Sequence, residues 1–241
     1  DNLGDKSKDA SRGVNKLGKA TQLLAGAFSI AFAARLGKAA FDLSQLGAAA
    51  ERSERALANL AGGTQQAAEY IEAVQKASQG TISQMEAMQA STTAMTLGVV
   101  DSAEQMQRLT EIAVTLGQAQ GIDATQSISN MTSALGRQST MILDNLGITM
   151  KAGEAYELYA QRIGKTVEEL TDAEKRQAFT TEALERGAEV AARLGGVQRD
   201  AASETERFRA AWADLRQEIG EDFAPAAGTA INKLTELMRA A

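Results

Sequence analysis

A Leu-Gly pair returns at a fixed interval in the middle of the chain. Leu97-Gly98, Leu116-Gly117 and Leu135-Gly136 are each 19 residues apart. A repeat this short has room for one helix and a tight turn. One such helix cannot bury its apolar stripe alone, so neighbouring helices must cover it. The repeat therefore predicts a packed array of short helices, and a scaffold rather than an enzyme.

The composition favours helix throughout the chain. The 241 residues include one proline, and proline is the residue that most strongly interrupts helices from inside. Aromatic residues make up only 4%, which favours thin helical layers over a large core packed with rings. We expect an all-α protein with a central bundle of short helices, flanked by long N- and C-terminal helices.

Several classes of active site are excluded by residue types that the chain lacks. It contains no histidine and no cysteine, which removes thiol nucleophiles, Ser-His-Asp triads and thiolate zinc sites. Two carboxylates can hydrolyse glycosides, but the pairs Glu168-Glu169 and Glu221-Asp222 stand at helix-capping positions or on polar helix faces. We therefore expect no enzyme, with no catalytic, cofactor-binding or metal-binding residues.

The pattern divides the chain into three parts. Residues 1–63 form an N-terminal helical arm, residues 64–195 a helical-array domain, and residues 196–241 a long C-terminal helix. Glycines at the ends of the expected helices are interpreted as helix stops or hinges, because glycine adopts the left-handed conformation at least cost. These are Gly62, Gly63, Gly98, Gly117, Gly136, Gly195 and Gly196.

Helix starts in the array are marked by side chains that accept hydrogen bonds from first-turn amides. They are Thr64, Thr81 (with Gln84), Asp101 (with Glu104), Asp123 (with Gln126), Thr166 (with Glu169) and Thr171 (with Glu174). Short helices are expected near 139–146 and over 154–163. The capping box at Thr171 predicts a long helix that ends near Leu194.

The N-terminal arm is basic although the net charge is −6. It carries Arg12, Lys16, Lys19, Arg35 and Lys38 with no acidic residue between positions 10 and 41. Such a face can bind DNA phosphates. No aromatic interleaving or nucleic-acid motif accompanies it, which favours a solvated helix face, and DNA contact stays open.

An apolar run over residues 20–34 lies inside this arm. Its large side chains are Leu23, Leu24, Phe28, Ile30 and Phe32. The run is shorter than the roughly 20 residues that span a bilayer. This length favours a buried packing helix over a membrane-inserting one, and both remain open.

The C-terminal helix carries an apolar stripe in steps of four, three, four and four: Phe208, Trp212, Leu215, Ile219 and Phe223. Pro225 is expected to interrupt the helix. Large apolar groups must be buried, either on the helical array or on copies of the chain. The stripe is our candidate for self-association, and we expect a homo-oligomer, with a trimer favoured.

Three stretches together resemble phage tail tape measure proteins. They are MTLGVVDSAEQ from Met95, SALGRQSTMILDNLGI from Ser133, and YELYA with GKTVEELTDAEKRQAF between Tyr156 and Phe179. The resemblance covers about residues 64–195. We expect the chain to be a fragment of a longer protein, because it starts without methionine and ends within a helical pattern, and the resemblance is consistent with this.

The resemblance implies a structural role in the virion. Proteins of this family are mostly helical, with long coiled-coil segments, and occupy the lumen of the tail tube. Their length sets tail length during assembly, and they leave ahead of the genome at delivery. The implied partners are tail tube and tail-tip or baseplate proteins, with a late contact to the host membrane. No catalytic residue is carried over.

Three other functions compete with this one. A membrane-active helical pore former would use residues 20–34 as its inserting segment. A cell-wall glycosidase would need convergent carboxylates in a cleft. A plain adaptor bundle is compatible with every pattern above.

Overall fold

The computed structural model describes the backbone of residue 42 and residues 45–240, and the side chains as far as Glu221. Contacts divide the chain into two units, Ala49–Glu218 and Asp1–Ala48 with Ile219–Ala241. The apolar segment 20–34, with Leu23, Leu24, Phe28, Ile30 and Phe32, lies outside the described residues, as does the basic arm. The side chain of Phe223 lies outside them as well.

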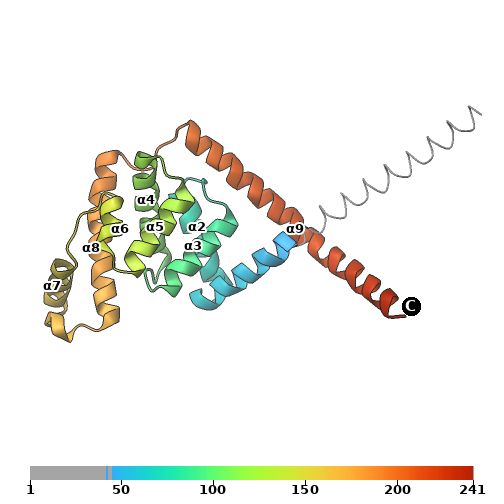
Figure 1. The fold of residues 1–241 in the computed structure, drawn as a ribbon, viewed down its shortest axis with the longest axis horizontal. Helices are drawn as coiled ribbons and strands as arrows, with labels where there is room; N and C mark the ends of the chain where they lie inside the picture. Colours follow the sequence, from blue (N-terminus) through green and yellow to red (C-terminus); the bar gives the residue numbers. More distant parts are fainter. Residues whose placement is uncertain (1–41, 43–44, 241) are drawn as a thin grey trace, which may run out of the picture. The chain divides into compact units, whose positions relative to one another are not determined.

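Every regular element in the described part of the chain is a helix, which confirms the all-α prediction (Figure 1). A helix through residues 45–61 comes first. It is followed by α2 (Thr64–Ala77), α3 (Gln84–Thr96), α4 (Ala103–Gln120), α5 (Ala124–Gly136), α6 (Thr140–Asn145), α7 (Ala152–Ile163), the 3-10 turn η1 (Val167–Glu169), α8 (Asp172–Leu194) and α9 (Ala201–Ala240).

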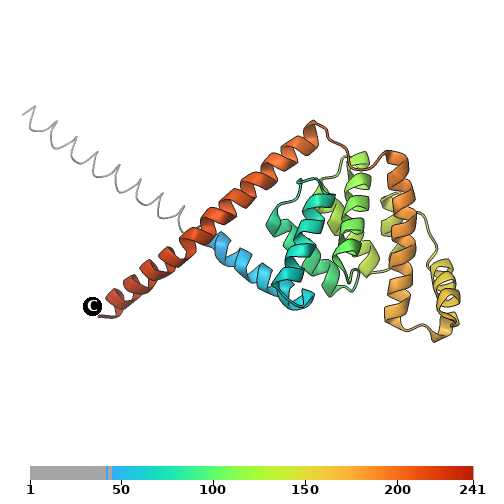
Figure 2. The ribbon, with the colours of Figure 1, turned by 180° about the vertical axis from the view of Figure 1, so that it is seen from behind.

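Helix α4 is the centre of the larger unit. It packs against α2, α5 and α8, and the two opposite views show it between α8 and the α2–α3 pair (Figures 1 and 2). Helices this short are marginal alone in water, so the shared core stabilises them. The large apolar side chains that α4 buries in this core are Met106, Leu109, Ile112, Val114 and Leu116.

Most helix starts occur at or within two residues of the predicted positions. Asp123 and Thr171 cap α5 and α8 as expected, and Thr171 forms a full capping box with Glu174. Three predictions were wrong. The α3 box is formed by Ser83 rather than Thr81, because the Thr81 hydroxyl donates to the carbonyl of Ser78.

The other two corrections have the same local character. Ser102, not Asp101, caps α4, because the hydroxyl of Ser102 accepts the hydrogen bond from the backbone N–H of Gln105. Gly63 stands at the N-cap of α2, so Thr64 is already its first helical residue.

The Leu-Gly repeat does not end three equivalent helices. Gly98 has φ 64° just after α3, and Gly136 is the last residue of α5. Gly117, predicted as a helix stop, lies inside α4, which ends at Gly121 with φ 70°. A Cβ atom on Gly117 would lie 1.8 Å from the Ser127 hydroxyl oxygen. This glycine therefore permits α5 to approach α4.

The paired glycines do act as helix stops. Gly62 and Gly63 have φ of 89° and 155° between the first helix and α2. Gly195 and Gly196 have φ of 87° and 74° after α8. These pairs coincide with the predicted domain limits at 63 and 195, while the contacts group residues 49–218 into one unit.

The smaller unit contains a close helix crossing. A Cβ atom on Gly47 would come within 2.8 Å of the carbonyl carbon of Gly220, so the two backbones touch. Gly220 belongs to α9, which continues as one helix through Pro225. The predicted interruption at this proline is therefore wrong.

Candidate interaction surface on α9

The segment that leads into α9 is held by glutamine side chains of the bundle. Gln79, just after α2, donates to the carbonyl of Val197 over 3.0 Å. The side-chain oxygen of Gln79 accepts from Arg207 over 3.2 Å and from Arg199 over 3.4 Å. Gln79 has φ 53°, a left-handed conformation that is uncommon for a residue other than glycine. It thus ties both the linker and α9 to the end of α2.

The pair Gln118 and Gln198 fixes the same linker to α4. The backbone N–H of Gln198 donates to the Gln118 side-chain oxygen over 2.9 Å, and the Gln118 amide donates to the Gln198 carbonyl over 3.2 Å. Asp200 directly precedes α9, and its carboxylate accepts from the backbone N–H of Ser203 over 2.7 Å. That hydrogen bond lowers the pKa of Asp200. The start of α9 is therefore fixed by directional polar contacts.

Two carboxylates of α9 lie at the N-termini of bundle helices, where unpaired backbone N–H groups favour negative charge. Asp214 accepts a hydrogen bond from the backbone N–H of Gln84 at the start of α3, over 2.7 Å. Glu206 lies at the start of α5. Burial raises the pKa of Glu206, and the negative charge of Asp123 raises it further. Burial also raises the pKa of Asp214. These carboxylates position α9 across the ends of α3 and α5.

The side of α9 that faces the bundle is small and polar. Ser203, Ala210 and Gln217 are buried, and they recur every seven residues. Residues seven apart lie on the same face of a helix after two turns. The half-buried Arg207 and Asp214 flank this row. The packed side of α9 therefore buries little apolar area.

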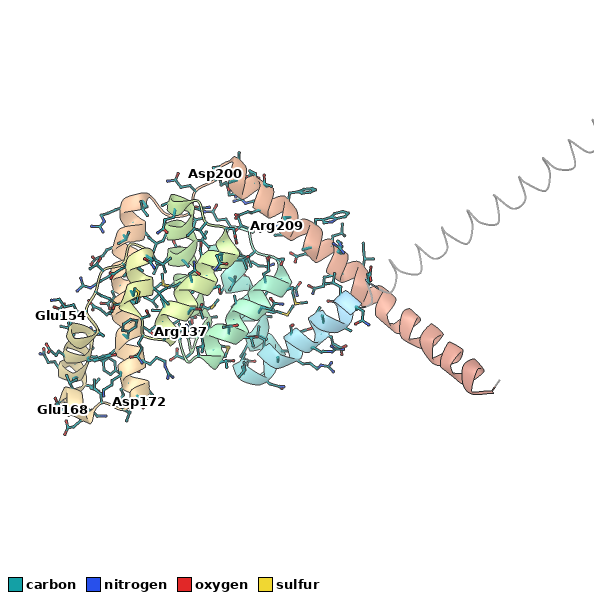
Figure 3. The ribbon with its side chains drawn as sticks, viewed as in Figure 1. Arg137, Glu154, Glu168, Asp172, Asp200 and Arg209 are labelled. Carbon is teal, nitrogen blue, oxygen red and sulfur yellow. The ribbon has the colours of Figure 1, made fainter. Side chains whose placement is uncertain are left out.

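The predicted stripe lies on the other side of the helix, and its described members are solvent-exposed. The exposed fractions are 73% for Phe208, 54% for Trp212, 46% for Leu215 and 37% for Ile219. Figure 3 shows large side chains projecting from α9 on the side away from α3 and α5. Exposed apolar surface of this kind marks an interaction site more often than isolated apolar residues do.

A cavity of about 310 Å³ between α4 and α8 is the main alternative site in the described region. Its polar lining includes Asp101, Gln105, Arg108, Gln177 and Thr180, and the buried Thr180 hydroxyl has no hydrogen-bond partner. Only one carboxylate lines it, so it offers no acid and base pair for hydrolysis.

The predicted carboxylate pairs do not supply such a site either. Glu169 accepts from the backbone N–H of Thr166 in the cap of η1, beside its neighbour Glu168. The side chain of Asp222 is outside the described part. No cluster of three or more metal-ligating side chains occurs among the described residues.

Comparison with known proteins identifies no family for this chain, so its class is described by its fold and by the exposed surface of α9. No family model matches the sequence, and no solved structure matches the fold. The described chain is an all-α helical bundle with an exposed apolar stripe on a long helix. None of its described helices is both long enough and apolar enough to span a lipid bilayer.

Proposed function

We propose that this chain is part of a bacteriophage tail tape measure protein, a structural component that sets tail length and is released at genome delivery. The observation that carries the proposal is the exposed stripe on α9, an assembly surface on a helix held in place by its other side. The resemblance over residues 95–117, 133–148 and 156–179 supports the choice of family.

The dimensions of α9 suit a ruler. Its 40 residues form one helix, which extends about 60 Å at 1.5 Å per residue. A continuous helix adds a fixed length for each residue, whereas a flexible chain does not. In this proposal the partners are further copies of the chain, tail tube proteins and tail-tip or baseplate proteins, and the chain is located in the virion.

The experiment uses the phage that encodes the chain. An insertion of about 28 helix-forming residues into the second half of α9 keeps whole heptads and should lengthen the tail by about 42 Å. Tail length is measured by electron microscopy. The matched control is an equally long insertion between α6 and α7, in the loop at residues 147–151, which should leave tail length unchanged.

Two results would contradict the proposal. The chain could be absent from purified tails by mass spectrometry. Alternatively, tails assembled with the α9 insertion could keep their original length.

A further inference from the structure

The exposed side of α9 has the spacing of a coiled-coil seam. Steps of four, three and four place Phe208 and Leu215 at heptad positions d, and Trp212 and Ile219 at positions a. In this register Thr205 is the preceding a position. The three buried residues that recur every seven positions, Ser203, Ala210 and Gln217, all occupy position f.

This register separates the two sides of the helix. Position f lies opposite the a and d seam, and b and c lie beside f. Glu206 at b, with Arg207 and Asp214 at c, are the half-buried residues that face the bundle. The bundle therefore holds α9 through positions c and f and through Glu206 at b. The next b position, Ala213, is exposed, as are the a, d, e and g positions along residues 204–219.

The charges beside the seam differ in sign. Glu204 and Glu218 occupy g positions, while Arg209 and Arg216 occupy e positions, and all four are exposed. In a parallel pair, residue g of one helix faces residue e of the next heptad in its partner, so Glu204 would face Arg209 of the second copy. In an antiparallel pair, e faces e, so Arg209 would face Arg216 of the second copy. The charges therefore favour the parallel pair.

We infer that the α9 stripe pairs with the same stripe of a second copy, with the helices parallel and in register. The inference rests on the assembly role proposed above and specifies its partner. Leu215 at d and Ile219 at a are the residue types that favour two strands. These two residues therefore favour a dimer of the chain over the trimer expected from sequence.

The seam is short, and the bundle compensates for its length. From Thr205 to Ile219 it extends about 20 Å. Isolated helices of this length are marginal, so pairing free peptides would require ordering them first. Here Gln79 and Asp214 already hold the helix in place, which lowers the entropy lost on association. Trp212 and Phe208 supply most of the apolar area.

The test uses the absence of native cysteine in the full chain. Thr205→Cys places one thiol at an a position, where two copies meet only in a parallel, in-register pair. The matched control, Ala213→Cys, places a thiol at an exposed b position, outside the seam. We expect mild oxidation to give a covalent dimer for Thr205→Cys and little for Ala213→Cys. Equal cross-linking of the two variants would overturn the inference.

A charge exchange tests the orientation without cross-linking. Arg209→Glu should weaken pairing about tenfold, because Glu204 would face a second carboxylate. Glu204→Arg should weaken it similarly, and a mixture of the two variants should form mixed pairs with near-original affinity. Trp212 is the only tryptophan, so a blue shift of its emission at rising concentration reports burial of the seam.

The outcomes separate this inference from the proposed function. Dimers without Thr205→Cys cross-links, and without complementation between the charge variants, would overturn the parallel register and leave self-association intact. A chain that stays monomeric at every concentration would overturn pairing through α9 altogether. The tail-length experiment tests the family role independently of both results.

Discussion

The carboxylate of Asp214 accepts a hydrogen bond from the backbone N–H of Gln84, 130 residues earlier in the chain. The bond joins the middle of α9 to the first residue of α3, beside the Ser83–Glu86 capping box. It lets a helix without a buried apolar stripe hold a defined position on the bundle.

Asp214→Ala should lower the free energy of unfolding by about 1 kcal/mol through loss of this hydrogen bond. Asp214→Asn keeps an acceptor oxygen. Burial raises the pKa of Asp214 in the folded state above its unfolded value. The free energy of unfolding therefore falls as the pH rises through the folded pKa, because the buried carboxyl group becomes ionised. Asp214→Asn should therefore be at least as stable as the original chain at pH 7. Urea unfolding measures both variants, and equal losses would contradict this account.

Gly117→Ala should destabilise the bundle by about 1–3 kcal/mol or more, because the new Cβ would overlap Ser127. Gly153→Ala is the matched control, since Gly153 also lies in a helix and a Cβ there meets nothing within 4 Å. That control should be neutral or gain up to about 1 kcal/mol. Thermal unfolding compares them. An unchanged melting temperature for Gly117→Ala would contradict this account, because it would mean that α4 and α5 can move apart at little cost in free energy.

The stability of the α8 start should fall in acid. The pKa of Glu174 is lowered to about 2, first by its hydrogen bond with Lys165 and then by those with Thr171. A lowered pKa contributes stability above the unfolded pKa of about 4.5 that is lost as pH falls toward 2.

Glu174→Gln should therefore flatten the pH dependence of unfolding between about pH 4.5 and 2. Lys165→Met removes the hydrogen bond and the charge of Lys165 but keeps the two hydrogen bonds from Thr171, so it should give an intermediate profile. Denaturant unfolding at a series of pH values measures all three chains. An unchanged profile for Glu174→Gln would refute this assignment.

Phe208→Asp and Trp212→Ala should weaken self-association, because each removes apolar area from the exposed stripe. Sedimentation velocity over a concentration series measures the effect. Met141→Asp is the matched control, since Met141 is 73% exposed, as Phe208 is, but lies on α6. Unchanged sedimentation of the two stripe variants would remove this surface from the interface.

Local signals made much of the fold predictable. The Thr171 box and the glycines at 195 and 196 place α8 correctly, because a cap and a stop act within one turn. Thr81 and Asp101 failed because Ser83 and Ser102 stand one or two residues away with equal chemistry. Sequence alone does not decide between such neighbours.

Tertiary contacts made the rest unpredictable. The role of Gly117 depends on Ser127, which only packing brings close. The stripe on α9 follows from its spacing, but its exposure depends on which side the bundle holds. The row of Ser203, Ala210 and Gln217 was a missed signal, because small and polar residues every seven positions mark a second contact face. Gln79 offered no signal, since its conformation is not encoded by residue type.

The attachment of α9 has a calorimetric consequence. Exposure of apolar surface raises the heat capacity on unfolding, while exposure of polar surface lowers it. The buried row of α9 contributes one alanine methyl group and otherwise polar or small groups. Detachment of α9 from the bundle should therefore change the heat capacity little. Scanning calorimetry should detect mainly the unfolding of the bundle.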